Sequence, residues 1–186
     1  MAAAEPRLIL TICGSLRAGS TNAAVLRTAA AVAPDGASVR SYGGMGALPH
    51  FDPDQDIEPL DPAVAELRAA IGEAGAVLLC TPEYAGALPG SFKNLLDWTV
   101  GGSEMYGKPV AWINASSIAA PTAGADAHDS LAKVLGYVGA DVVAEACSRI
   151  PLNRQMVGPA GLVDDSDARE RISAVLTRLT EHLGRR

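Results

Sequence analysis

Residues 14–22 read GSLRAGSTN and combine hydroxyl and amide side chains with one arginine. The stretch follows a strand-length apolar run and precedes a segment rich in alanine and leucine that is typical of a helix. N–H groups in the first turn of a helix lack intrahelical partners, and the helix dipole there favours negative charge. The sequence therefore predicts a phosphomonoester site, with Arg17 as the charged partner and neutral donors from Ser15, Ser20, Thr21 and Asn22. The alternative is a plain capped helix with a surface arginine.

Other phosphate-binding motifs lack residues that they require. A nucleoside-triphosphate loop, G-x-x-x-x-G-K-[ST], fits at Gly14 and Gly19, but Ser20 stands where the lysine belongs. The dinucleotide pattern G-x-G-x-x-G is absent. A cysteine phosphatase would need an arginine where Gly19 follows Cys13. What remains is a loop that holds a terminal phosphate without chemistry on it, as mononucleotide cofactors are held.

A second candidate loop opens the stretch 81–98, TPEYAGALPGSFKNLLDW. Its prolines and glycines predict a stiff, exposed connection that leads into a helix. Such a loop can present backbone N–H and C=O groups to the edge of a flat ring, with Tyr84 beside it. The alternative is an ordinary connection with a surface tyrosine.

These loops must be positioned by elements that alternate along the chain. Short apolar runs predict strands at 7–13, 38–42, 76–80, 109–115 and 141–150. Helical patterns predict helices at 20–33, 61–74, 89–99, 126–138 and 166–183. This order predicts a doubly wound, five-stranded parallel α/β sheet in a single domain, 1–186. Ligands then bind at the carboxyl ends of the strands, near loops 14–22, 81–91 and 115–125.

Composition limits the function classes. The net charge is −6 without a basic block, so we expect no nucleic-acid partner. The three cysteines are widely separated, which argues against a disulfide framework or a metal site. No basic region precedes a long apolar run at the N-terminus, and no apolar run approaches membrane-spanning length. We therefore expect a cytoplasmic protein with no membrane partner.

GSLRAGSTNAAVL and TPEYAGALPGSFKNLLDW together resemble the two signature loops of the NADPH-dependent FMN reductase family, which includes quinone, azo-dye and chromate reductases. GKPVAWINAS, at 107–116, is similar to the family's fourth strand. The resemblance covers roughly 7–145. It implies a flavodoxin-like fold with sheet order 2-1-3-4-5.

The resemblance also implies roles for particular residues. The FMN phosphate would be surrounded by Ser15, Arg17, Ser20, Thr21 and Asn22. The isoalloxazine ring would be lined, largely through backbone hydrogen bonds, by Pro82, Glu83, Tyr84 and Ala85. Ser116 and Ser117 fall where the family's third loop meets the flavin.

Two positions depart from the family pattern. The family usually has asparagine after Pro-Glu-Tyr, where this chain has Ala85. The family's third loop is usually glycine-rich, whereas residues 116–130 read SSIAAPTAGADAHDS and keep only Gly124 near the expected place.

The resemblance implies an FMN-dependent NAD(P)H oxidoreductase. Hydride would pass from NADPH or NADH through flavin N5 to a quinone, free flavin or similar small-molecule acceptor. No acid–base pair is required, and we predict neither a catalytic side chain nor a metal ligand. One alternative is a flavodoxin-like FMN-binding or electron-carrier protein without efficient NADPH turnover, and another is a non-flavin protein that retains only the fold.

Family members usually dimerise through the helix at 89–99, and a homodimer or homotetramer is expected. Large apolar residues on and beyond this helix would form the dimer face or, alternatively, part of the monomer core. They are Phe92, Leu96, Trp98 and Met105.

Overall fold

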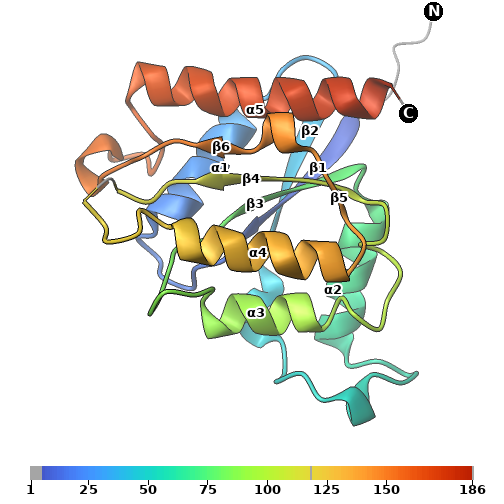
Figure 1. Cartoon of the computed structure of the whole chain (residues 1–186). Coiled ribbons are helices and arrows are strands. Elements are labelled where there is room, and N and C mark those ends of the chain that lie inside the picture. Colours follow the sequence, from blue (N-terminus) through green and yellow to red (C-terminus); the bar gives the residue numbers. More distant parts are fainter. Residues whose placement is uncertain (1–5, 118, 186) are drawn as a thin grey trace, which may run out of the picture.

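The computed structural model describes residues 6–117 and 119–185. Strands lie at β1 (Arg7–Cys13), β2 (Ala37–Tyr42), β3 (Ala76–Cys80), β4 (Pro109–Asn114), β5 (Asp141–Val142) and β6 (Ser148–Arg149). Helices lie at α1 (Thr21–Ala31), α2 (Pro62–Glu73), α3 (Gly90–Asp97), α4 (Ala125–Tyr137) and α5 (Ser166–Gly184). Strands and helices alternate as predicted, and helices lie on both sides of the sheet (Figure 1).

The sheet is parallel throughout, with strand order β2-β1-β3-β4-β5. This confirms the flavodoxin-like order. Every residue of β3 is buried because α1 and α5 cover one face of the sheet and α2, α3 and α4 cover the other. The strand order reverses between β1 and β3, which is where such sheets bind ligands at the carboxyl ends of their strands.

The fifth strand differs from the prediction of one strand over 141–150. It consists of β5 and β6, separated by a 3-10 turn at Ala144–Ala146. Val110 of β4 pairs with Val142 of β5, and Ile113 of β4 pairs with Ser148 of β6. The chain therefore uses six residues on the fifth-strand side, from 142 to 148, where β4 uses three. The extra residues leave the line of the strand so that Ala146 can be buried in the core beneath α5. Tertiary packing thus overrides the local strand pattern.

Capping residues explain where the first two helices begin. Ser20 caps α1, and its Oγ accepts a hydrogen bond from Ala23 N–H at 3.4 Å. Asp61 caps α2 just before Pro62, and its Oδ1 accepts from Ala63 N–H at 2.8 Å. Both starts fall within one or two residues of the predicted ones because the signal is local.

The residues expected at a dimer face lie instead in the monomer core. Phe92, Leu96, Trp98 and Met105 are each at most 2% exposed. They pack with α2 and the α4 side of the sheet. The prediction of a dimer face made by these side chains was therefore wrong, because the apolar side of α3 points into its own chain.

The segment between β2 and α2, about residues 43–60, runs along α3. The side-chain amide of Asn94, on α3, makes two hydrogen bonds to this segment. Its Nδ2 donates to Pro49 O at 2.8 Å, and its Oδ1 accepts from Phe51 N–H at 2.7 Å. Farther along, the Asp56 carboxylate forms a buried ion pair with Arg68 at 2.7 Å. These contacts hold a long loop against the fold without bringing it into the cavity described below.

Candidate functional site

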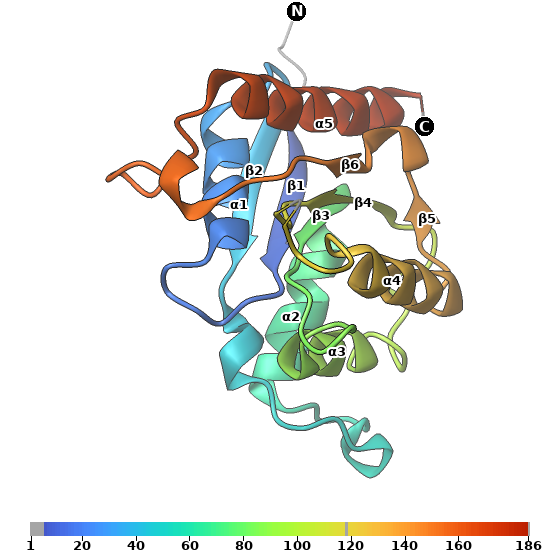
Figure 2. The same ribbon diagram turned by 60° about the vertical axis from the view of Figure 1, so that its left-hand side comes forward.

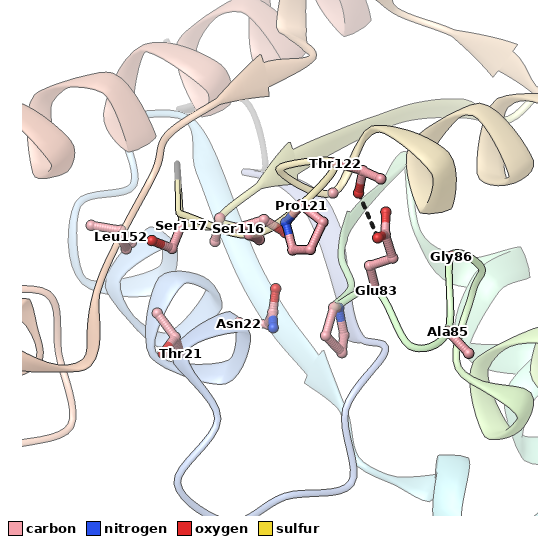
Figure 3. A pocket seen from close by; sticks show the side chains of 14 residues that line it. Thr21, Asn22, Glu83, Ala85, Gly86, Ser116, Ser117, Pro121, Thr122 and Leu152 are labelled. Atoms are coloured by element: carbon pink, nitrogen blue, oxygen red, sulfur yellow. Dashed lines mark hydrogen bonds between the residues drawn. The ribbon is translucent and has the colours of Figure 1, made fainter.

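The three loops singled out in the sequence meet at one edge of the sheet and surround a cavity of about 530 Å³ (Figure 3). Its lining comes from the start of α1, the β3–α3 and β4–α4 connections, and the chain just after β6. The lining residues are Thr21, Asn22, Pro82, Glu83, Ala85, Gly86, Ala115, Ser116, Ser117, Ala120, Pro121, Thr122, Gly124 and Leu152. Glu83 is the only ionisable residue among them.

Most of the predicted site residues line this cavity: Thr21, Asn22, Pro82, Glu83, Ala85, Ser116 and Ser117. Ser15, Arg17 and Ser20 lie beside it in the loop that leads into α1, and Ser15 Oγ accepts from Arg17 N–H at 3.3 Å. The Arg17 side chain is exposed. Tyr84 is 47% exposed and lies next to the lining residues without joining them.

A buried thiol orients Asn22 in the first turn of α1. Cys80, at the end of β3, donates its S–H to Asn22 Oδ1 at 3.2 Å. Burial raises the pKa of Cys80 well above its usual value and also raises that of Cys13, its neighbour on β1. Both thiols therefore stay protonated near neutral pH, which makes them structural groups and poor nucleophiles.

Glu83 joins the second loop to the third. Its Oε1 accepts from Thr122 Oγ1 at 2.5 Å, and its Oε2 accepts from Ala127 N–H at 3.2 Å. Ala127 lies in the first turn of α4, whose own N-cap residue, Gly124, supplies no side-chain acceptor. The carboxylate therefore caps α4 from another part of the chain and fixes the two walls of the cavity relative to each other (Figure 3).

Both walls end in tight turns with two consecutive residues at positive φ. In the second loop these are Ala85 (φ 52°) and Gly86 (φ 70°), and in the third they are Ala123 (φ 52°) and Gly124 (φ 80°). In the first of these turns, Tyr84 and the residue after Gly86 exchange two backbone hydrogen bonds. Two positive φ values define the type I′ turn, which favours Asn-Gly. The family's asparagine after Pro-Glu-Tyr thus suits the backbone here, and Ala85 adopts it at a cost.

Asn114, at the end of β4, supports the third loop from below. It is buried, its Nδ2 donates to Ala123 O at 3.1 Å, and its Oδ1 accepts from Ser116 N–H at 3.0 Å. A Cβ on Gly124 would lie 2.4 Å from Ser116 Oγ, so the turn admits only glycine there. Asn114 was not predicted, although an amide closing an apolar strand was its signal in the sequence.

His128 is a second buried group that the sequence did not reveal. Its Nδ1 bonds to Gly124 O at 2.7 Å, while its buried Nε2 has no hydrogen-bond partner within residues 6–117 and 119–185. Burial lowers its pKa from the ordinary 6.5, against the opposing effects of the Gly124 carbonyl and the carboxylates of Glu83 and Asp129. The neutral imidazole therefore stabilises the turn that closes the cavity.

In the part of the chain that the structure describes, no group of three or more His, Cys, Asp or Glu side chains is placed to hold a metal ion. Within the same residues, no helix combines the length and apolar character needed to cross a bilayer.

A doubly wound parallel sheet of order 2-1-3-4-5, with an almost uncharged cavity at its strand ends, defines a flavodoxin-like α/β protein. Comparison with known proteins narrows this class. Residues 8–151 match the model of the NADPH-dependent FMN reductase family. The chain belongs to that family, and the resemblance seen in the sequence is confirmed.

Individual relatives extend the match over nearly the whole chain. A quinone reductase of Escherichia coli is 31% identical over 185 residues, which is 97% of each chain. An NAD(P)H-dependent FMN reductase of Pseudomonas aeruginosa is 32% identical and covers 92% of each chain. The solved structure of FerB, a flavoenzyme NAD(P)H:(acceptor) oxidoreductase from Paracoccus denitrificans, superposes with a TM-score of 0.82 at 25% identity, over 96% of this chain and 98% of FerB.

Family membership makes the protein an oxidoreductase that uses FMN and a nicotinamide reductant. The residues present fit FMN. Helix α1 begins beside the cavity, and the N-terminal end of its dipole lies next to hydroxyl, amide and guanidinium side chains that suit a phosphate. The cavity itself is lined by apolar and neutral polar residues, and its one carboxylate is already hydrogen-bonded, which suits a flat, uncharged ring system.

Proposed function

We propose that this protein reduces quinones, free flavins or similar small acceptors with electrons from NADPH or NADH, using FMN held in the cavity between the three loops. The observation that carries the proposal is the junction of the α1 N-terminus with an almost uncharged cavity at the strand ends. The names of the relatives support quinones as acceptors, since the Escherichia coli protein is a quinone reductase.

The phosphate end of FMN is assigned to the loop before α1. Binding in the micromolar range corresponds to about 8 kcal/mol. The helix dipole contributes roughly 0.3–2 kcal/mol, and each charge-assisted hydrogen bond adds about 1.5–3 kcal/mol. A few such contacts together with partial burial of the ring reach this range. The assigned residues are Ser15, Arg17, Ser20, Thr21 and Asn22.

The ring end of FMN is assigned to the second and third loops. Bound FMN would supply the redox chemistry, namely hydride transfer from the nicotinamide. The chain itself positions the ring through the backbone of Pro82, Glu83, Tyr84 and Ala85 and through Ser116 and Ser117. The hydrogen bonds of Glu83 to the third loop keep this frame at a constant width. No side chain needs to act as an acid or base.

Purified protein, stripped of any flavin and then titrated with FMN, tests the proposal directly. We expect the flavin spectrum to change on binding and NADPH or NADH oxidation to depend on both FMN and a quinone. A protein that leaves the spectrum of FMN unchanged and oxidises neither nicotinamide would contradict it.

The departure of the third loop from the glycine-rich family pattern favours a second candidate, an FMN-binding carrier without efficient NADPH turnover. This candidate predicts normal FMN binding but slow reduction by NADPH or NADH and rapid reduction by dithionite. Stopped-flow reduction by each reductant separates the two proposals.

The proposal also includes a cellular location, a domain organisation and an oligomeric state. A cytoplasmic location agrees with Cys13, Cys80 and Cys147 all being free thiols. A single domain over 1–186 agrees with one sheet that both helical layers share. A homodimer or homotetramer is proposed from the family resemblance, and light scattering on the purified protein tests it. The interface cannot be the buried side of α3 and must use other residues.

A further inference from the structure

The chain between β6 and α5 lies against α1, next to the loop assigned to the phosphate (Figure 2). Arg27 on α1 donates from Nε and Nη2 to Gly161 O at 3.1 and 2.9 Å. Thr28, also on α1, accepts from Val163 N–H at 2.9 Å through a buried hydroxyl. At its other end Leu152 lines the cavity. The segment is therefore fixed relative to the start of α1.

Arg154 stands at the point of this segment that meets the loop before α1. It opens a 3-10 turn, Arg154–Met156, which Asn153 caps by accepting from Gln155 N–H at 2.9 Å. A Cβ built on Gly19 would lie 3.3 Å from Arg154 Nη2, so the guanidinium borders the backbone just before the first turn of α1.

Arg17 and Arg154 both lie near the start of α1, Arg17 in the loop that precedes the helix and Arg154 beside Gly19. Among the described residues, neither the Arg17 nor the Arg154 side chain takes part in any of the hydrogen bonds or ion pairs of the fold, whereas Arg27, Arg68 and Arg169 all do. Two arginines near one helix N-terminus create a local positive charge in a protein whose net charge is −6. This local charge would attract an anion, and a bound anion would relieve the repulsion between the two guanidinium groups.

The charge of the phosphate supports this reading. A phosphomonoester carries about −1.5 to −2 charges at neutral pH. The N-terminus of a helix supplies roughly half a positive charge, and one arginine supplies one more. Arg17 and α1 together supply about 1.5 positive charges, which matches the lower figure for the phosphate but falls short of the higher one, so a fully ionised phosphate is compensated only with a second guanidinium.

We propose that Arg154 is a second charged ligand of the FMN phosphate and makes the site selective for FMN over riboflavin. The inference rests on the proposed FMN site. It is argued from this chain's own geometry, in which the Arg154 guanidinium borders the backbone at Gly19.

Equilibrium titration of the apo-protein with FMN and with riboflavin, which lacks the phosphate, tests the inference. For Arg154→Ala we expect the dissociation constant for FMN to rise about tenfold or more, and that for riboflavin to stay unchanged. Arg154→Lys keeps the charge but loses two-point geometry, so its FMN constant falls between those of Arg154→Ala and the wild type. Added salt should weaken FMN binding less steeply in Arg154→Ala than in the wild type.

Arg178→Ala is the matched control, since Arg178 is an exposed arginine on α5 that donates to Glu145 O. It should bind both flavins as the wild type does. Wild-type affinity of Arg154→Ala for FMN would overturn the inference and leave the proposed function standing. An equal loss of FMN and riboflavin would also overturn it, because it would indicate a purely structural role. A wild-type protein that binds neither flavin would refute the proposed function as well.

Discussion

The contact of Glu83 with the third loop can be tested by removing its carboxylate. Glu83→Ala removes a hydrogen bond from Thr122 that is worth about 1.5 kcal/mol at a half-buried site. It also removes the cap on Ala127 N–H, worth about 1 kcal/mol. Allowing for solvent that replaces part of both bonds, we expect the free energy of unfolding to fall by about 2 kcal/mol.

For a chain of 186 residues, this loss corresponds to a melting temperature about 4–8 °C lower. Thermal unfolding of the apo-protein followed by circular dichroism measures it. Glu83→Gln keeps one acceptor oxygen but loses the charge at the start of α4, so its melting temperature should fall about half as far. Glu170→Ala, at an exposed position on α5, is the matched control and should melt as the wild type does.

The two Glu83 variants should also bind FMN more weakly, since the contact between the second and third loops is lost or weakened. A melting temperature of Glu83→Ala within about 1 °C of the wild type would refute the stabilising role of the Glu83 carboxylate. That result would mean that the carboxylate bonds to solvent in the folded protein and caps nothing.

Three further predictions follow from the turns and from His128. Ala85→Asn should raise the melting temperature by about 2–4 °C, because asparagine adopts positive φ more readily than alanine, and an unchanged melting curve would contradict this. Gly124→Ala should lower stability by about 2 kcal/mol or more in urea unfolding, since its Cβ would clash with Ser116 Oγ, and a wild-type midpoint would show that the third loop yields. The pKa of His128 is lowered in the folded protein, so the unfolded chain binds the proton more readily and stability should be lost as the pH falls below about 6.5. His128→Gln should flatten this dependence in urea unfolding between pH 5 and 7, and an identical slope would exclude His128 as its source.

Features with local signals were predicted well from the sequence. Ser20 and Asp61 cap the helices that they were expected to begin, because a cap depends on neighbouring backbone N–H groups. The loop residues that line the cavity were found because a doubly wound sheet places its βα connections at one edge. The helix caps and the loop positions could both be predicted from local sequence and from the order of the strands and helices.

Features that depend on distant parts of the chain were missed. Glu83 meets Thr122 across 39 positions, and no pattern near either residue marks that pairing. Leu152 enters the cavity because the break between β5 and β6 redirects the chain. The sequence left the apolar side of α3 open between a dimer face and the monomer core, because a hydrophobic stripe has the same pattern whether it faces its own core or a second copy.

The position of Leu152 has a consequence for biosynthesis. Leu152 completes the cavity lining and leaves the ribosome after β1 through β4 and α4, and its segment is attached to α1 through Gly161 and Val163. A nascent chain that ends before these residues has the start of α1 but no finished pocket. Because the proposed FMN cavity is complete only once this segment is in place, we expect FMN to bind to the nearly full-length chain and not to shorter nascent chains.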